Sequence, residues 1–223
     1  MRAWPRIFPF ALLIFGLFCD SMLTFLVSYW PSAVALQPWS YSLRTLMVFG
    51  ALGFVWRELT ELKCPALDRL QLPIGCFVGV LVFILWINLG PLVRMGDDAN
   101  STRVPWPEGE WQKHVWVAIR VFGAVIVVPL VEEVFWRSYL MRRLDSSDFG
   151  RLSPDLVSRF ALLASSFVFA LAHRELLAAF VTGIIYAWLY RRTRNLWTAI
   201  AAHATTNLLL AIYVLYTSRY EFW

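Results

Sequence analysis

Long apolar runs separated by short charged breaks dominate the pattern of this chain. Seven such runs lie near residues 8–29, 41–56, 72–93, 118–140, 159–174, 176–190 and 196–217. A bilayer core about 30 Å thick is crossed by about 20 mostly apolar helical residues. The pattern therefore predicts an all-α fold, a polytopic transmembrane helix bundle of about seven spans.

The composition excludes an ordinary soluble domain. Of the 223 residues, 59% are hydrophobic and only 16% are charged, which is far from the usual balance of a soluble protein. This length has room for about six to eight spans with short loops. We expect an integral, multi-pass membrane protein whose main partner outside its substrate is the lipid bilayer.

Lysine and arginine alternate between the two sides of the predicted spans. They are dense after the fourth run and between the sixth and seventh, and they also occur before the first and after the second. On the other side, residues 31–40 have none, the acid-rich residues 94–113 have three, and Arg174 and Arg219 stand alone. By the positive-inside rule, this pattern favours a cytoplasmic N-terminus. The net charge of +5 is then explained without a nucleic-acid partner. A cleaved signal peptide over residues 1–35 is an alternative, but we expect a retained first helix.

Two adjacent carboxylates, Glu132 and Glu133, lie in the middle of the fourth run, with Arg137 four residues after the second of them. Ionisable groups in hydrocarbon are unfavourable and usually functional. Residues four apart share a helical face, so we expect Arg137 to pair with Glu133. Glu132 is then the carboxylate left for catalysis. Pro129 has no amide hydrogen and should free a backbone carbonyl one turn earlier in this helix.

Two further polar pairs occur at helical spacing in later runs. Phe169 precedes His173 by four residues, and His203 precedes Asn207 by four, so each pair shares a helical face. We interpret Phe169 as the packing neighbour that fixes the ring of His173. His203 and Asn207 both carry hydrogen-bond donors, which suit stabilisation of a developing oxyanion.

Other polar residues within the runs are interpreted as structural. Arg44 and Arg120 are expected to extend toward a membrane interface, and Asp20 to pair with another helix or to line a cavity. Gly75 and Gly79 form a GxxxG pattern that could allow close approach of a second helix.

The polar groups together suit the addition of water to an amide. Glu132 with His173 would activate the water, and His203 with Asn207 would stabilise the oxyanion. The sequence has no HExxH zinc motif, no GxGD aspartyl motif and no GxSG serine motif. No cofactor is expected, although a metal ion held by Glu132, His173 and His203 is an alternative.

In order along the chain, the EExxxR, FxxxH and HxxxN patterns resemble the family of CAAX prenyl proteases and bacteriocin-processing enzymes. The resemblance covers about residues 118–217. It implies an intramembrane glutamic endopeptidase in which Glu132 and His173 activate water, His203 and Asn207 form the oxyanion site, and Glu133, Arg137 and Phe169 support them.

The same resemblance leads to expectations about Ser138, the location of the protein and its substrate. Many members have glycine after the motif arginine, whereas this chain has Ser138, which puts tight helix packing there in doubt. The small size is similar to bacterial members, so we expect a location in the bacterial inner (cell) membrane. The substrate would be a membrane-associated protein or peptide, with C-terminal processing of a prenylated or sorting-signal-bearing protein as one possibility.

The predicted organisation has three parts: N-terminal transmembrane helices and loops (1–117), a catalytic core (118–217) and a C-terminal tail (218–223). Nothing in residues 1–117 identifies a substrate pocket. The short hairpin at Arg174 and Glu175 predicts an aqueous opening near His173. Two other functions stay open, a non-enzymatic immunity or scaffold protein and a proton-coupled transporter, since buried carboxylates and histidines also form proton relays.

Overall fold

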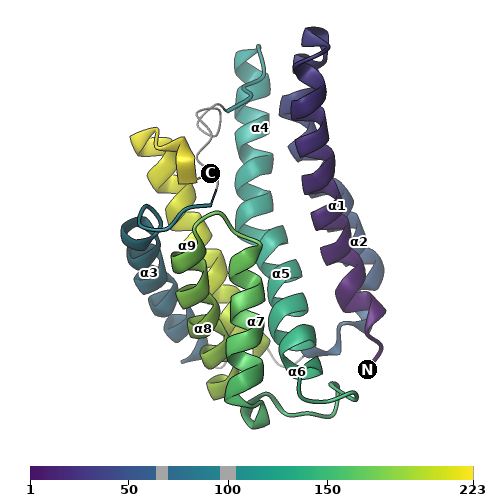
Figure 1. The fold of residues 1–223 in the computed structure, drawn as a ribbon, viewed down its shortest axis with the longest axis vertical. Helices are drawn as coiled ribbons and strands as arrows, with labels where there is room; N and C mark the ends of the chain where they lie inside the picture. Colours follow the sequence, from purple (N-terminus) through teal and green to yellow (C-terminus); the bar gives the residue numbers. More distant parts are fainter. Residues whose placement is uncertain (64–69, 96–103, 223) are drawn as a thin grey trace.

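The computed structural model describes residues 1–63, 70–95 and 104–222, and helices are the only regular secondary structure in these ranges. The helices, labelled in Figure 1, are α1 (Trp4–Val27), α2 (Gln37–Val55), α3 (Gln71–Leu89), α4 (Glu110–Phe122), α5 (Val128–Glu133), α6 (Met141–Arg143), α7 (Arg159–Leu171), α8 (Leu176–Thr193) and α9 (Leu196–Thr217). Every predicted apolar run coincides with a helix, which confirms the polytopic helical bundle.

Four helical segments in the described ranges are long and apolar enough to cross a membrane, by length and composition. They are Trp4–Val27, Gln71–Leu89, Glu110–Arg143 and Leu196–Thr217. The other three predicted spans form α2, α7 and α8. That these three also cross the membrane remains a prediction.

The fourth run forms a helical segment longer than predicted, because helix begins at Glu110 instead of residue 118 and continues to Arg143. At about 1.5 Å per residue, its 34 residues extend well beyond a bilayer core. Two stretches of this long helix, Gly123–Val127 and Val134–Leu140, are π-helical. Such wider turns occur frequently at functional sites, and here they lie on either side of the two glutamates.

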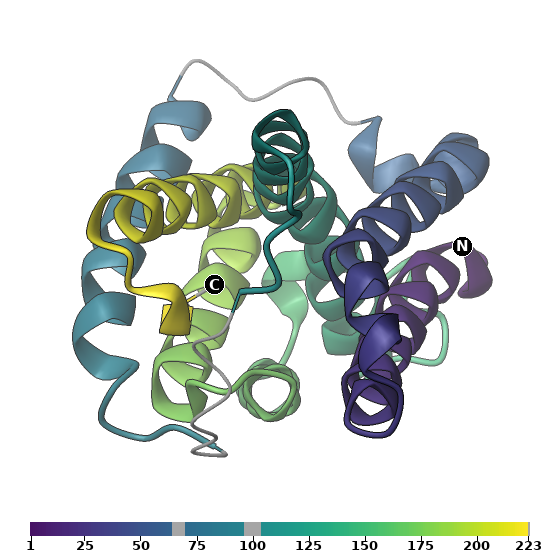
Figure 2. The same cartoon turned by 90° about the horizontal axis from the view of Figure 1, so that it is seen from above.

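The long helix stands between two groups of helices, as Figures 1 and 2 show. The α1–α2 pair lies on one side, and α3, α7, α8 and α9 lie on the other. The most extensive helix pairing in the described chain is that of α3 with α9. A Cβ atom at Gly75 would lie 2.8 Å from the carbonyl oxygen of Thr198, and one at Gly79 would lie 2.4 Å from that of Ala202. The GxxxG pattern therefore does provide the close approach of a second helix.

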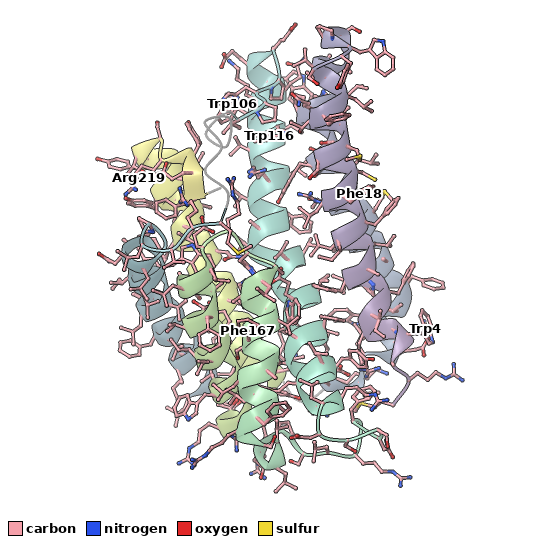
Figure 3. The ribbon with its side chains drawn as sticks, viewed as in Figure 1. Trp4, Phe18, Trp106, Trp116, Phe167 and Arg219 are labelled. Atoms are coloured by element: carbon pink, nitrogen blue, oxygen red, sulfur yellow. The ribbon has the colours of Figure 1, made fainter. Side chains whose placement is uncertain are left out.

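Large apolar side chains cover much of the outer surface. Trp4 and Phe18 on α1 and Phe167 on α7 (Figure 3) are 41%, 58% and 53% exposed. A surface of this kind is unfavourable in water and is expected where helices face lipid chains. This surface agrees with an integral membrane protein.

Basic residues gather at one end of the bundle. The N-terminus, α6, the start of α7 and the junction between α8 and α9 all lie at this end (Figure 1). They bring together basic residues that include Arg2, Arg142, Arg143, Arg159, Arg191 and Arg192. Basic residues are thus denser at this end of the bundle than at the other, where Arg219 lies (Figure 3).

Two arginines that were expected to extend toward a membrane interface have defined partners in the bundle. Arg44 forms an ion pair with Asp20 on α1, and this pair identifies the helix partner that Asp20 was expected to have. Arg120 packs its guanidinium against the rings of Tyr41, at 4.5 Å, and Trp116, at 5.3 Å. An ion pair and two aromatic faces stabilise these cations within the bundle.

Candidate active site

Glu132 and Glu133 are both buried, but their partners differ. The carboxylate of Glu133 is 0% exposed and its Oε2 lies 3.1 Å from Nε of Arg137, so the predicted pairing four residues along the helix is confirmed. Glu132 has no arginine partner. Its Oε2, like Oε2 of Glu133, has no hydrogen-bond partner among the described residues. The local geometry of the helix thus separates one ion-paired carboxylate from one that is available for chemistry.

His173 lies at the end of α7 with its ring held on two sides. Its Nδ1 is 2.8 Å from the carbonyl oxygen of Phe169, which can only accept, so Nδ1 carries the hydrogen. The ring centroids of Phe169 and His173 are 4.3 Å apart. Trp86 on α3 contacts the same imidazole edge to face at 5.9 Å. These contacts place a hydrogen on Nδ1 and leave Nε2 free for another partner.

The free nitrogen of His173 faces Glu132. The distance from His173 Nε2 to Glu132 Oε2 is 3.9 Å, which is too long for a direct hydrogen bond. One water oxygen about 2.8 Å from each atom would satisfy both. Two acceptors at this separation can therefore orient a single water molecule.

His203 on α9 contacts the second glutamate. Its Nδ1 lies 2.9 Å from Oε1 of Glu133, so the carboxylate of Glu133 lies between Arg137 on its own helix and His203 on another. Sequence reasoning did not foresee this contact, because it joins residues 70 apart. Only Nε2 of His203 can then face a bound substrate.

Asn207, one turn after His203, is anchored to the long helix. Its Nδ2 donates to the carbonyl oxygen of Ala124 at 2.7 Å. Within the π-helical turn, the amide of Val128 donates to Gly123, and Pro129, five residues after Ala124, has no amide hydrogen to donate. The predicted free carbonyl is thus present, and the asparagine side chain satisfies it. An amide nitrogen has two hydrogens, so one remains for a ligand.

A cavity of about 270 Å³ opens beside these groups. His173, His203 and Asn207 are on its wall. Glu132 is not among the lining residues, but its Oε2 lies 3.9 Å from Nε2 of His173. Its other lining residues are Tyr41, Trp86, Arg120, Ala124, Val128, Phe169, Glu175, Tyr186, Leu210, Ala211, Val214 and Phe222. The cavity reaches both His173 and the α7–α8 hairpin at Glu175, where an opening was predicted.

The cavity includes side chains from residues 1–117, where the sequence alone identified no substrate pocket. Tyr41 from α2 and Trp86 from α3 both line it, and so does Phe222 from the C-terminal tail. A lone tryptophan near the end of an apolar run is typical of a membrane interface, so its sequence position gave no sign of a site.

Tyr186 on α8 is a site residue that the sequence did not reveal. Its ring lies 5.2 Å from that of His203 and 5.5 Å from the guanidinium of Arg137. Its hydroxyl donates to Thr206 at 2.8 Å, and the hydroxyl of Thr206 lies 2.9 Å from the carbonyl oxygen of Gly79. Only its polar hydroxyl within a predicted span could have indicated this position.

Phe169 contacts Arg137 as well as His173. The guanidinium of Arg137 lies 4.4 Å from the centre of the Phe169 ring, within the range of a cation–π interaction. All seven residues singled out in the sequence are therefore brought into one connected region. In the described parts of the chain, no group of three His, Cys, Asp or Glu side chains is arranged as a set of metal ligands.

Comparison with known proteins shows what this region is similar to. Residues 114–209 match the family model described as Type II CAAX prenyl endopeptidase Rce1-like. The chain is also 31% identical over 99 residues to "Putative membrane peptidase YdiL" of Bacillus subtilis (strain 168). That match covers 43% of this chain and 37% of the relative, so the chain spans well under half of that protein. No solved structure matches.

The matched segment contains the three motifs and the helices that carry them. Glu132, Glu133 and Arg137 on the long helix, Phe169 and His173 on α7, and His203 and Asn207 on α9 all fall within residues 114–209. Through this segment, the chain is similar to the family of CAAX prenyl proteases and bacteriocin-processing enzymes.

Proposed function

We propose that this protein is an intramembrane endopeptidase that hydrolyses a peptide bond of a membrane-associated protein or peptide. The observation that carries the proposal is the 3.9 Å separation of Glu132 Oε2 and His173 Nε2, beside a cavity whose wall holds His203 and Asn207. The family match and the name of the Bacillus relative support the same reaction class.

In the proposed reaction, a water molecule donates one hydrogen bond to Glu132 and one to His173. Its lone pair then points away from both acceptors and toward the carbonyl carbon of the substrate. Glu132 accepts the proton as the new C–O bond forms, in the manner of a general base. The proton passes to the leaving nitrogen when the C–N bond breaks, so no covalent enzyme intermediate is needed.

His203 and Asn207 would stabilise the tetrahedral oxyanion. The second hydrogen on Asn207 Nδ2 is available, because the first is donated to Ala124. A hydrogen bond from His203 Nε2 requires a proton on both of its ring nitrogens, since Nδ1 faces Glu133. Donors held rigidly where negative charge develops contribute strongly to catalysis.

The supporting residues would act through the reacting groups. Glu133 orients the ring of His203, Arg137 is the cation paired with Glu133, and Phe169 packs against His173. We propose that these three are positioning residues and that Glu132, His173, His203 and Asn207 are the catalytic residues.

The residues that line the cavity indicate which substrate side chains it would accept. Its apolar lining residues are Trp86, Ala124, Val128, Phe169, Leu210, Ala211, Val214 and Phe222. Such a wall favours apolar side chains next to the cleaved bond. This agrees with C-terminal processing of a prenylated or sorting-signal-bearing protein, with the basic end of the bundle in the cytoplasm.

The test uses the purified full chain in detergent and a panel of membrane-anchored C-terminal peptides, with and without a strong chelator. We expect wild type to cleave in the presence of chelator and Glu132→Gln to lose at least about 100-fold of the rate, which is the usual contribution of a general base. Glu110→Gln on the same helix, with an exposed side chain, is the matched control.

Two results would overturn the assignment. Cleavage that disappears with chelator and returns with added metal would replace the glutamate mechanism by a metal site at Glu132, His173 and His203. Retention of the wild-type rate in Glu132→Gln would remove this carboxylate from the mechanism.

A further inference from the structure

A second buried polar cluster lies on the long helix beyond the active site, toward the basic end of the bundle. We call it the ionic network, and its members are Arg6, Glu61, Ser138 and Arg142. Arg6 is 1% exposed, Ser138 0% and Arg142 4%, and the side chain of Glu61 is 6% exposed. Burial of four polar side chains from three separate parts of the chain is unfavourable unless they are paired.

Glu61 is the centre of the network. Arg6 from α1 donates from Nε to Oε1 of Glu61 at 2.9 Å, and the hydroxyl of Ser138 donates to the same oxygen at 2.7 Å. Arg142 donates from Nη2 to the hydroxyl of Ser138 at 2.7 Å and from Nε to the carbonyl oxygen of Ser138 at 2.6 Å. One carboxylate thus connects two buried guanidinium groups, directly for Arg6 and through Ser138 for Arg142.

Aromatic packing closes the network. The guanidinium of Arg6 lies 5.7 Å from the ring centre of Phe149, and that of Arg142 lies 5.6 Å from the same ring. Phe149 is only 3% exposed. The network is therefore a defined structure that joins α1, the segment after α2 and the end of the long helix.

Ser138 directly follows Arg137 in the π-helical stretch Val134–Leu140. Successive helical side chains point about 100° apart. Arg137 is directed toward Glu133, Phe169 and Tyr186, whereas Ser138 is directed toward Glu61. Arg137 and Ser138 therefore anchor the same helical turn to different neighbours on two of its faces.

A π-helical turn is a local departure from the regular α-helix, so contacts with other elements are needed to set its rotation about the helix axis. The rotation at Ser138 fixes where Arg137 lies. Arg137 in turn pairs with Glu133, which holds His203. This chain of contacts leads from Glu61 to a residue of the active site.

We infer that Glu61 and Ser138 are positioning residues, which set the rotation of the catalytic helix and so orient His203 through Arg137 and Glu133. The catalytic part of the inference rests on the proposed peptidase activity. The geometric part does not, because the orientation of His203 can be measured without cleavage. Ser138 gives this chain a hydrogen bond from the position after Arg137 to Glu61.

The direct measurement is 15N NMR of the full chain, labelled at histidine and reconstituted in lipid. The chain has three histidines, and His114→Gln and His203→Gln assign their signals. We expect Ser138→Ala and Ser138→Gly to shift the Nδ1 signal of His203. Glu58→Gln, an exposed carboxylate near Glu61 whose side chain pairs with Arg2 at 3.9 Å, should leave it unchanged.

The kinetic measurement separates positioning from substrate binding. Ser138→Ala should lower kcat about tenfold with KM unchanged, since small misplacements of a reacting group lower rates by such factors. Ser138→Thr, which keeps the hydroxyl, should recover part of the rate. Glu61→Gln combined with Ser138→Ala should lose no more than Glu61→Gln alone, because coupled residues are not additive.

The outcomes distinguish the two proposals. An unchanged His203 signal in folded Ser138→Ala overturns the inference whether or not the protein cleaves peptides. A shifted signal in a protein that cleaves none of the tested peptides supports the positioning role and counts against the proposed function. If Glu61→Gln does not fold, the Ser138 variants still decide the question.

Discussion

Two buried polar regions share the long helix, and they differ in how far their polar atoms are satisfied. In the ionic network, every member makes hydrogen bonds to protein groups. In the active site, Glu132 Oε2 and both terminal nitrogens of Arg137 have no hydrogen-bond partner in the described parts of the chain. Buried polar groups are normally satisfied, and in the candidate active site several are not. Single unsatisfied atoms also occur elsewhere in the described chain, for example at Ser42, Thr182 and Thr198.

The difference leads to opposite expectations for substitutions. Removing a satisfied buried charge leaves its partners uncompensated and lowers stability. Removing a buried carboxylate that lacks a partner should lower activity while stability is kept. The four predictions below test this contrast, from the largest expected effect to the smallest.

Glu133→Gln should have the largest effect on stability. Glu133 lies in the candidate active site, but its carboxylate is ion-paired, as Glu61 is in the ionic network. The substitution leaves Arg137 buried without its counter-charge, so we expect a loss of about 3–5 kcal/mol of stability. Thermal unfolding in detergent measures it, with Glu110→Gln as the exposed control. An unchanged melting temperature would show that the pairing of Glu133 and Arg137 does not stabilise the fold.

Asn207→Ala should affect activity more than stability. Loss of an oxyanion donor typically lowers kcat by about 100-fold to 1000-fold, and the freed Ala124 carbonyl should lower stability by about 1–3 kcal/mol. The control is Asn88→Ala, an exposed asparagine on α3 that donates to the carbonyl oxygen of Ile84 at 2.7 Å. A near-normal kcat would exclude Asn207 from the oxyanion site.

Gly79→Ala tests the packing that supports the active site from α3. The new methyl group would lie 2.4 Å from the carbonyl oxygen of Ala202 and 2.7 Å from Cβ of Thr205, so α3 and α9 must separate. We expect a loss of about 1–3 kcal/mol, as for overpacked cores. Gly53→Ala on α2, where a Cβ meets no atom within 4 Å, should be neutral or slightly stabilising in the same thermal unfolding measurement.

Tyr186→Phe should have the smallest effect of the four. It removes the hydrogen bond to Thr206 but keeps the ring against His203 and Arg137, so we expect a loss of about 1 kcal/mol in stability. Cleavage should stay within about threefold of wild type, equivalent to under 1 kcal/mol. Tyr29→Phe, which is 66% exposed, is the control. A tenfold fall in cleavage would instead assign the hydroxyl a part in the reaction.

The sequence by itself determined most of the helices and the pairing of Glu133 with Arg137. The seventh predicted run and α9 have the same bounds, from residue 196 to residue 217. These features are local: a long apolar run specifies a helix in lipid, and a four-residue spacing specifies a shared face. The free carbonyl near Pro129 was predictable for the same reason, since it follows from one missing amide hydrogen.

Only the tertiary structure decided which groups meet between helices. It placed His203 against Glu133 rather than Glu132, Asn207 against Ala124, and Trp86 beside His173. It also paired Asp20 with Arg44 and joined Glu61 to Ser138. These contacts depend on how helices cross and how each is rotated about its axis. Packing of the whole bundle sets those quantities, and the period of a single helix does not contain them.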